Sequence, residues 1–321
     1  MNTPHPPLTI IGDLGVDLVM GSIDGWPQIG TEVLLPRSEL RAGGSAANTA
    51  LALRHLGLPA HLISAIGNDE LGRLLQAQFH GVRTDLQICD RPSTVSVGLM
   101  HACGERNFFT THGHLEELSC EYVLAHLPPA SSQGAIVLLT GVFLLPRLRA
   151  AYLRLLQAIR GLGYQVALDT GWPSDQWNDT NLALVASWLP LCDHLLINEL
   201  EALSITGAAD LDTALARLAL ASQPEASIIV KTGAQGVTGL QAGQRIDHRS
   251  ARAEIFDTIG AGDSFNAGYL AMRLRGGSLA QALAAGCQAA VAILQRFPRS
   301  AIVPGELAGC LQQDGWTAEA A

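Results

Sequence analysis

Short apolar runs alternate with longer helix-like stretches over most of the chain. Runs rich in isoleucine, leucine, valine and alanine predict buried strands at residues 8–11, 60–66, 135–140, 165–169, 194–197 and 227–231. Helical spacing of apolar residues follows at 70–80, 146–162 and 180–189. Strands that alternate with helices are typical of a parallel sheet covered by helices on both faces, so the pattern predicts an α/β fold.

A second set of strand-like segments interrupts this alternation in the first third of the chain. Residues 31–41 are irregular and broken by proline and glycine, while 94–102 and 107–111 are joined by a turn at 103–106. These segments could form a small second sheet lying across an active site, with its strands within about 12–45 and 92–112.

The C-terminal part continues the main pattern. A strand is expected over 252–256 and a helix over 267–275, and the alanine-rich stretch 278–294 predicts a packed helix. Because no segment repeats at a fixed period and no low-complexity linker divides the chain, we expect a single domain over residues 1–321.

Composition narrows the function classes. Of the 321 residues 48% are hydrophobic and 15% charged, which suits a large buried core, and the net charge of −9 argues against nucleic acid or an anionic membrane as partner. The apolar stretch at 135–145 is too short to span a bilayer. Six scattered cysteines without a C-x-x-C pair, behind a polar and proline-rich start, indicate reduced thiols in a cytoplasmic protein.

The most distinctive stretch is Asp257-Thr258-Ile259-Gly260-Ala261-Gly262-Asp263. Glycines directly ahead of a helix-forming run allow a tight turn, and a helix N-terminus offers free N–H groups to an anion. A carboxylate inside such a site, Asp263, suggests that a proton is abstracted beside a developing negative charge.

A second glycine-rich site stands near the start, where Gly43-Gly44 lead into a helix that contains Asn48. Exposed N–H groups together with an amide that donates and accepts suit a polyhydroxylated ligand, although the glycines could also serve only close packing. Asp13 and Asp17 follow the first strand, where they could accept hydroxyl hydrogen bonds or simply form a turn.

Three further features point to the carboxyl ends of the later strands. Asn198 and Glu201 lie three residues apart at a helix start, which fits either one shared site or simple N-capping, and Asp169 also follows a strand. Lys231 is the only lysine, so a Walker P-loop is excluded. The turn after it could shape a nucleotide pocket or make a hairpin. The pair His112 and His114 lacks an evident third metal ligand.

Together these features fit phosphoryl transfer to a hydroxyl, in which positioning and electrostatic stabilisation carry most of the catalysis. The chain resembles a ribokinase/PfkB-type carbohydrate kinase over nearly its whole length. The glycine motif at 42–48 and, above all, the signature at 257–265 carry this resemblance, and Asn198-x-x-Glu201 is similar to the family's magnesium and phosphate motif.

The resemblance implies a ribokinase-like three-layer α/β/α fold with a β-sheet lid, ATP and Mg²⁺ as cofactors, and a homodimer formed through the lid. Asp263 would be the base, and Gly260, Ala261 and Gly262 would supply N–H groups to the γ-phosphoryl group. Four residues would hold the sugar hydroxyls: Asp17, Gly43, Gly44 and Asn48. The nucleotide side would be formed by Asn198, Glu201 (the latter on Mg²⁺ through water), Lys231, Gly233 and Gly236.

Two departures from the family pattern concern the ligands. The turn that helps to bind a monovalent cation in relatives stands near residues 296–301 and differs here, which puts K⁺ activation in question. Residues 169–173 lack the arginine found in many sugar-acid and fructose kinases, so a carboxylate- or phosphate-bearing substrate is less favoured. A nucleoside kinase of the same fold and a non-catalytic regulatory relative are the alternatives.

Overall fold

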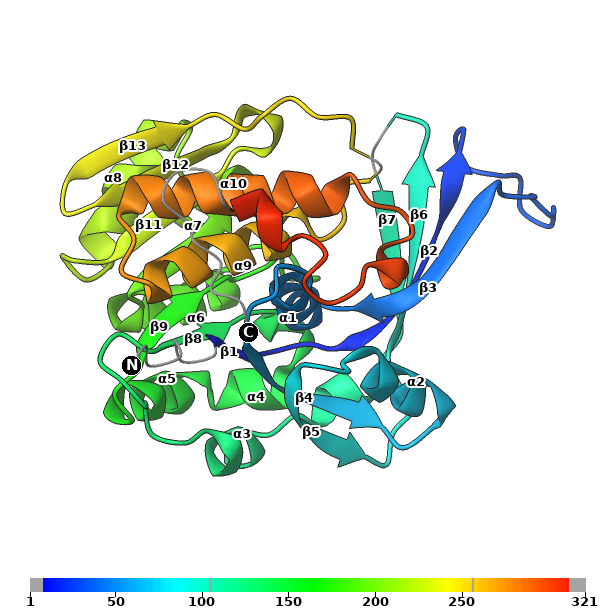
Figure 1. The fold of residues 1–321 in the computed structure, drawn as a ribbon, viewed down its shortest axis with the longest axis horizontal. Coiled ribbons are helices and arrows are strands. Elements are labelled where there is room, and N and C mark those ends of the chain that lie inside the picture. Colours follow the sequence, from blue (N-terminus) through cyan, green and yellow to red (C-terminus); the bar gives the residue numbers. More distant parts are fainter. Residues whose placement is uncertain (1–7, 104–105, 256, 312–321) are drawn as a thin grey trace.

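Two β-sheets organise the computed structural model, which describes residues 8–103, 106–255 and 257–311 (Figure 1). The larger sheet has nine strands in the order β13-β12-β11-β10-β9-β8-β1-β4-β5. Seven of them run parallel, namely β1 (Leu8–Ile11), β4 (Ala60–Gly67), β5 (Arg83–Cys89), β8 (Ile136–Leu139), β9 (Gln165–Leu168), β10 (His194–Asn198) and β11 (Ser227–Lys231). The last two form an antiparallel edge, β12 (Val237–Gln241) and β13 (Gln244–His248).

Helices cover both faces of this sheet. One face packs against α1 (Ser45–His55), α2 (Glu70–Gln78), α9 (Ala261–Leu274) and α10 (Leu279–Leu294). The other face packs against α3 (Cys120–His126), α4 (Pro146–Ala150), α5 (Tyr152–Gly161), α6 (Asp179–Trp188), α7 (Glu199–Thr206) and α8 (Leu211–Ala221). Along β8, Leu138 points into the first core and Leu139 into the second, as the two-residue period of a strand requires. The predicted three-layer α/β/α architecture is confirmed.

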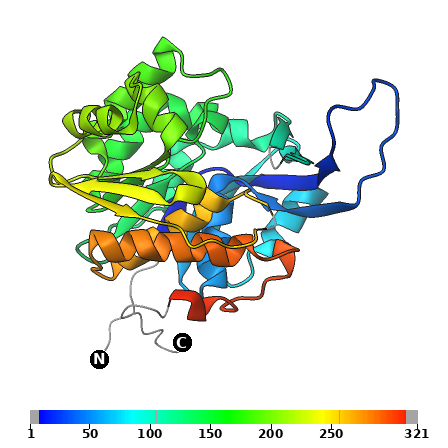
Figure 2. The ribbon, with the colours of Figure 1, turned by 90° about the horizontal axis from the view of Figure 1, so that it is seen from above.

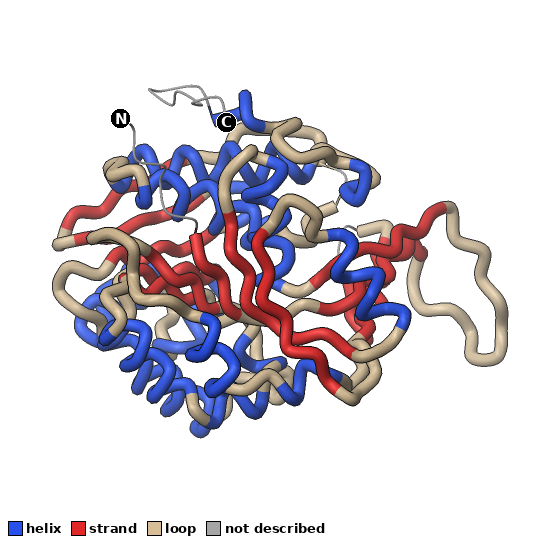
Figure 3. Tube along the Cα trace, turned by 60° about the horizontal axis from the view of Figure 1, so that its bottom comes forward, coloured by secondary structure: helices blue, strands red, loops and turns tan. Residues whose placement is uncertain are grey.

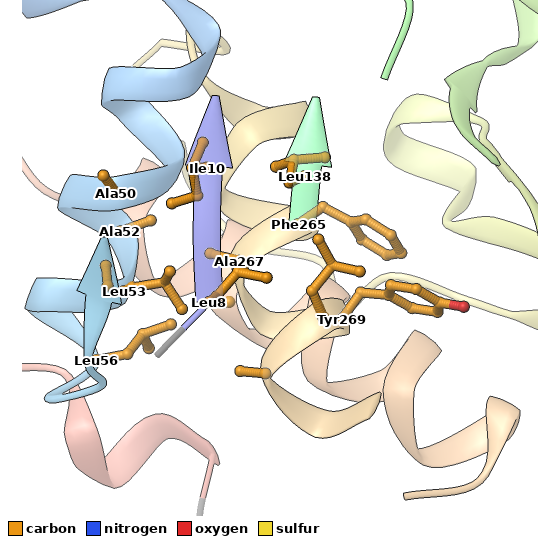
Figure 4. Packing of buried hydrophobic residues seen from close by; sticks show 14 of the residues in the cluster. Leu8, Ile10, Ala50, Ala52, Leu53, Leu56, Leu138, Phe265, Ala267 and Tyr269 are labelled. Carbon is orange, nitrogen blue, oxygen red and sulfur yellow. The ribbon is translucent and has the colours of Figure 1, made fainter. Parts of the chain in front are cut away.

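The first core fixes the start of α9, which carries the signature stretch. Ile10 of β1 and Leu53 of α1 lie with Phe265 of α9 in this core (Figure 4). Helices α9 and α10 approach closely, because a Cβ on Gly268 would stand 2.4 Å from the Ala285 carbonyl oxygen. Gly286 similarly leaves room for the Phe265 ring. Small residues in α10 thus explain why this apolar helix is buried against α9.

The second sheet has the order β3-β2-β6-β7 and projects from one end of the molecule (Figures 2 and 3). Its strands are β2 (Gly15–Ile23), β3 (Arg37–Gly43), β6 (Val95–His101) and β7 (Arg106–Thr110), within the ranges predicted for a lid. His114 fastens its base, since the Thr94 N–H donates to Nδ1 and Nε2 donates to the Leu14 carbonyl. The chain enters this lid just after β1 and leaves it just before α1, so both candidate sugar-site segments lie at the junction of the two sheets.

Four sequence predictions need correction. Residues 24–36 form the loop between β2 and β3, so the irregular strands expected in this region are found only from Arg37 onward. Residues 251–255 belong to neither sheet, and residue 256 lies outside the described chain, so the strand expected over 252–256 is not found. The chain there has already left the sheet edge at β13 and must return to the start of α9. The helix expected over 146–162 is divided at Ala151, whose φ and ψ of −111° and 13° are not helical. The helix expected from Ala267 begins earlier, at Ala261, which places Asp263 in its first turn.

Short 3₁₀ turns complete the description, at His114–Glu117, Val142–Leu144, Leu189–Leu191, Gly233–Gln235, Arg299–Ala301 and Ala308–Leu311. Across the described part of the chain, every helix is too short or too polar to cross a bilayer.

Candidate active site

The signature stretch forms a tight turn followed by a helix N-terminus. Gly260 has a left-handed φ of 74° and caps α9, and its carbonyl accepts the first helical hydrogen bond, from the Ser264 N–H at 2.9 Å. A glycine cap has no side chain to offer to the first-turn N–H groups, so a ligand can reach them. The Ala261 N–H makes a long hydrogen bond to the Thr258 carbonyl at 3.3 Å, which a bound anion would have to replace. This geometry suits an anion at Gly260, Ala261 and Gly262.

Asp263 lies half-buried in that first turn. Its Oδ2 accepts a hydrogen bond from Asn48 Nδ2 at 2.9 Å, and its backbone carbonyl accepts one from Thr49 Oγ1 at 3.2 Å. Burial, reinforced by the charge of Asp169, raises the pKa of Asp263 to about 8, while the Asn48 hydrogen bond works against the rise. A carboxyl whose pKa lies near neutrality is suited to general base catalysis.

The single lysine pairs with a carboxylate beside this turn. Lys231 Nζ donates to Asp169 Oδ2 at 2.8 Å, and Asn266 Nδ2 donates to the same oxygen at 2.6 Å. Burial by itself would lower the pKa of Lys231, but Asp169 and Glu201 outweigh it and raise the pKa. A Cβ on Gly262 would stand 3.2 Å from Nζ, so the ammonium group lies next to the anion site.

Asn198 and Glu201 form a reciprocal capping box at the start of α7. The Glu201 N–H donates to Asn198 Oδ1 at 2.9 Å, and the Asn198 N–H donates to Glu201 Oε2 at 2.8 Å. Burial and the neighbouring Asp169 raise the pKa of Glu201 to about 7, against the opposite effect of Lys231. Both residues also line a cavity of about 930 Å³, so capping and ligand binding are compatible roles for them.

A cavity of about 930 Å³ connects these groups. Its polar end contains residues of the signature turn and of three neighbouring strand ends: Asp169, Asn198, Glu201, Lys231, Gly260, Ala261, Gly262 and Asp263. Its apolar wall comes mainly from α10: Cys287, Ala290, Val291 and Leu294. Because Asn198 of β10 is in register with Lys231 of β11, the parallel sheet itself sets their spacing.

A comparison with protein families decides the identity. Residues 16–303 match the model described as pfkB family carbohydrate kinase. The chain belongs to the pfkB family. A fructokinase of Klebsiella pneumoniae is 32% identical over 255 residues, covering 74% of this chain and 80% of the relative. A 2-dehydro-3-deoxygluconokinase of Escherichia coli K12 is 27% identical and covers 82% and 90%.

The fold agrees with solved kinases. The ribokinase of Arabidopsis thaliana, complexed with ribose and ATP, superposes with a TM-score of 0.74 at 23% identity, covering 96% of this chain and 99% of that one. Membership of the pfkB family makes this protein a phosphotransferase with an alcohol group as acceptor.

The sugar-site residues predicted for this pfkB kinase lie beside the cavity, at the base of the lid. Gly43 is required for close approach, since a Cβ there would stand 2.0 Å from Asp17 Cγ, and Gly44 has a φ of 97° against the Asp13 backbone. Burial raises the pKa of Asp17 to about 7, although Arg41 opposes the rise. Among the predicted sugar-site residues Asp17, Gly43, Gly44 and Asn48, it is Asn48 that donates a hydrogen bond to the catalytic candidate Asp263.

Several residues without an assigned role find one in the structure. Asp13, in the connection between β1 and β2, caps α1, because its carboxylate accepts from the Ser45 and Ala46 N–H groups at 3.0 and 3.2 Å. His114 uses both ring nitrogens within the fold, whereas His112 is exposed and pairs with Glu116. The pair therefore does not converge on a common point.

The turn after Lys231 combines both roles that the sequence left open. Gly236 has a φ of 118° and makes the hairpin between β11 and β12, where a Cβ would stand 2.1 Å from the His248 carbonyl oxygen. Gly233 and Gly236 also line the 930 Å³ cavity.

Sequence reasoning missed two arginines at this site. Arg106 on the lid strand β7 lines the cavity and donates to Thr258 Oγ1 at 3.1 Å, which joins the lid to the signature turn. Arg299, from a 3₁₀ turn near the C-terminus, is buried against Asp257. Neither has a local sequence signal, because both contacts are made only in the folded chain.

Proposed function

We propose that this kinase transfers the γ-phosphoryl group of ATP to a hydroxyl of a small neutral sugar, with Asp263 as general base. The observation that carries the proposal is the placement of Asp263. This half-buried carboxyl, with a pKa of about 8, stands in the first turn of α9 next to the N–H groups of Gly260–Gly262 and lines the 930 Å³ cavity. The first turn thus combines an anion site and a base.

The cavity fits a nucleotide. Its volume of about 930 Å³ lies within the usual range for cofactor sites, with an apolar wall on α10 for a base and cationic groups at the other end. Those cations include Lys231, Arg106 and Arg252. The related Arabidopsis ribokinase, whose structure holds ATP, supports the same ligand here.

The oxygen-rich end of the cavity suits Mg²⁺, which prefers carboxylates, phosphate oxygens and water. Asn198 and Glu201 would hold the ion through water, with Asp169 close by. When bound, Mg·ATP supplies the phosphoryl group and neutralises its charge. The positive charge of Lys231 partly neutralises the carboxylates of Asp169 and Glu201.

The remaining chemistry belongs to the chain. Asp263 accepts the hydroxyl proton as the oxygen–phosphorus bond forms, so a strong base is unnecessary, and Asn48 holds the carboxylate in place. General base catalysis typically contributes about 10²–10⁴-fold. The backbone N–H groups of Gly260–Gly262 stabilise the charge on the transferring group, and losing one such donor costs about 10²–10³-fold.

A neutral sugar fits the lid base better than a sugar acid. Asp17 places a carboxyl group at the base of the lid, and burial there makes a nearby anion costly. After Asp169 the chain continues with Thr170, Gly171 and Trp172, and no cation is supplied to meet a substrate carboxylate. Of the two relatives compared, the fructokinase is the one named for a neutral sugar. The missing arginine does not separate the two, because many fructose kinases have it as well.

A substrate panel tests the proposal. Fructose, ribose and other neutral sugars, 2-dehydro-3-deoxygluconate and nucleosides are incubated with Mg·ATP, and ADP formation is measured with Asp263→Asn as the blank. We expect a neutral sugar to give the highest kcat/KM. Preference for a nucleoside or a sugar acid would refute the substrate class. Transfer that is independent of Asp263 would refute the role of the base.

We also propose that two copies associate through their lids. Large apolar side chains are exposed on the lid and its long loop, namely Trp26, Ile29, Leu34, Phe108 and Phe109. Such a cluster is characteristic of an interface. Light scattering after gel filtration should give a dimer of the 33.9 kDa chain, and Phe109→Asp should give a monomer. Leu220→Asp on α8, at another exposed leucine, is the control that should remain dimeric.

A further inference from the structure

A buried arginine lies directly behind the signature turn. Arg299 Nη2 donates to Asp257 Oδ1 at 2.6 Å and to the Asp257 carbonyl oxygen at 3.0 Å, and Nη1 donates to the Ile259 carbonyl oxygen. Three oxygens from two residues thus converge on one guanidinium group. The side chains of Arg299 and Asp257 are only 10% and 3% exposed, so solvent barely screens the pair.

These contacts orient the backbone of the anion site. The peptide between Ile259 and Gly260 is not among the cis peptides of the described chain, and in a trans peptide the C=O and N–H groups point in opposite directions. Holding the Ile259 carbonyl on Arg299 therefore turns the Gly260 N–H away from the guanidinium group. Gly260 lines the 930 Å³ cavity, where an N–H turned in this direction can meet an anion.

Arg299 also packs closely against Gly260 of the turn. A Cβ on Gly260 would stand 3.5 Å from Arg299 Nη1 and equally far from Asn48 Nδ2, the group that holds Asp263. Asp257 Oδ1 additionally accepts from the Ile259 N–H at 2.9 Å, so the carboxylate closes the turn from the same side. The turn, the arginine and the support of the base form one connected unit.

The oxygens on Arg299 are a carboxylate and two backbone carbonyls, a ligand set that hard metal cations also use. An arginine side chain keeps its charge at every physiological pH. We propose that Arg299 is a positioning residue that serves as the protein's own fixed cation beneath the anion site, so that phosphoryl transfer needs no monovalent metal ion. This inference rests on the proposed function of the Gly260–Gly262 turn.

The structure also indicates that a cation from solution can replace the guanidinium group of Arg299 if that side chain is removed. A second cavity of about 330 Å³ is also lined by Gly260, together with Arg299 and Asn48. If the side chain is truncated, a small cation can reach the three oxygens through this cavity. Arg299→Ala should therefore create a dependence on added K⁺ or guanidinium ion that the natural protein does not have.

The experiment compares four proteins at constant ionic strength in K⁺, Na⁺ or tetramethylammonium buffers: wild type, Arg299→Ala, Arg299→Lys and the control Arg296→Ala. Arg296 belongs to the same segment but is half exposed and pairs loosely with Glu306 at 3.6 Å. We expect wild type and the control to vary by no more than about twofold between cations. In tetramethylammonium, Arg299→Ala should lose about 10²–10³-fold in kcat with little change in the KM of the sugar.

Added K⁺ or millimolar guanidinium chloride should restore about tenfold or more of that loss in Arg299→Ala only, since each could bind the freed oxygens. The kcat of Arg299→Lys should lie between those of wild type and Arg299→Ala, because an ammonium group lacks the planar fork with which a guanidinium group meets several acceptors. The same cations should raise the melting temperature of Arg299→Ala but not that of wild type.

Two results would overturn the inference. One is a wild type that K⁺ activates several-fold; the other is an Arg299→Ala protein whose kcat neither falls nor responds to cations. If that variant does not fold, the wild-type cation series and Arg299→Lys decide. A wild type inactive on every acceptor would instead refute the proposed function, and the melting temperatures would still test Arg299.

Discussion

Replacing Asp263 by asparagine should remove activity and at the same time stabilise the protein at alkaline pH. The folded-state pKa of about 8 is above the ordinary 3.8, so between these values the folded protein holds a proton that the unfolded chain has released. The stability contributed by this proton is complete below pH 4 and is lost as the pH rises towards 8. Each pH unit in that window costs about 1.4 kcal/mol of unfolding free energy.

Asparagine isolates this effect because its amide oxygen can still accept the hydrogen bond from Asn48 Nδ2, while it has no proton to release. From pH 5.5 to 8.5 the free energy of unfolding of Asp263→Asn, relative to wild type, should therefore increase by about 3 kcal/mol. Other titrating groups are common to both proteins and largely cancel in this difference. The value is a substantial part of the roughly 5–15 kcal/mol that holds a domain together.

Urea unfolding at the two pH values measures this difference, and initial rates with Mg·ATP measure kcat. We expect kcat to fall about 10²–10⁴-fold with similar KM values, and wild-type kcat/KM to rise with pH up to about 8, as ionisation of Asp263 requires. Asp24→Asn, on the exposed loop after β2, is the control. A stability difference that does not change with pH, or a variant with wild-type turnover, would refute the reasoning.

Two further substitutions separate the metal side from the sugar side. Glu201→Gln keeps an oxygen for the Asn198 N–H and so preserves the α7 cap, but the Mg²⁺ concentration for half-maximal rate should rise about tenfold or more; an unchanged Mg²⁺ titration would contradict the assignment. Asp17→Asn retains the size that fits against Gly43, and it should raise the KM of the sugar about tenfold or more without changing that of ATP. Equal changes in both KM values would indicate a general structural effect instead.

The main sheet could be predicted because its central strands are buried on both faces and appear as continuous apolar runs. The edge strand β5, with sequence RTDLQIC and mostly half-buried side chains, has no such run and was missed. The segment after β13 shows the reverse case, a strand-like sequence that forms no strand. Residues 252–255 have a strand-like composition, but they follow the edge strand β13 and pair with neither sheet.

The same distinction explains what could be predicted of the site. Glycines, a helix start and a carboxylate within seven consecutive residues indicated the turn around Asp263 directly. The role of Asp169 could not be assigned, because its contact with Lys231 spans 62 residues and depends on β9, β10 and β11 being neighbours in the sheet. Arg299 meets Asp257 across 42 residues in the same way. Tertiary contacts of this kind carry no local pattern.

Further tertiary contacts link the predicted sugar site to the segment that contains Arg299. On the lid strand β3, Glu39 Oε2 accepts from Arg41 at 2.9 Å, and Arg41 in turn opposes the burial-raised pKa of Asp17 at the sugar site. The other oxygen of Glu39 accepts from the Ser300 N–H at 2.8 Å, next to Arg299.

Glu39 therefore connects the lid strand that flanks the predicted sugar site to Ser300, the residue next to Arg299. A movement of β3 on sugar binding would act on Ser300, and through Arg299 on the orientation of the Gly260 N–H. Because buried, hydrogen-bonded charges resist separation, we expect these contacts to couple the predicted sugar site to the signature turn.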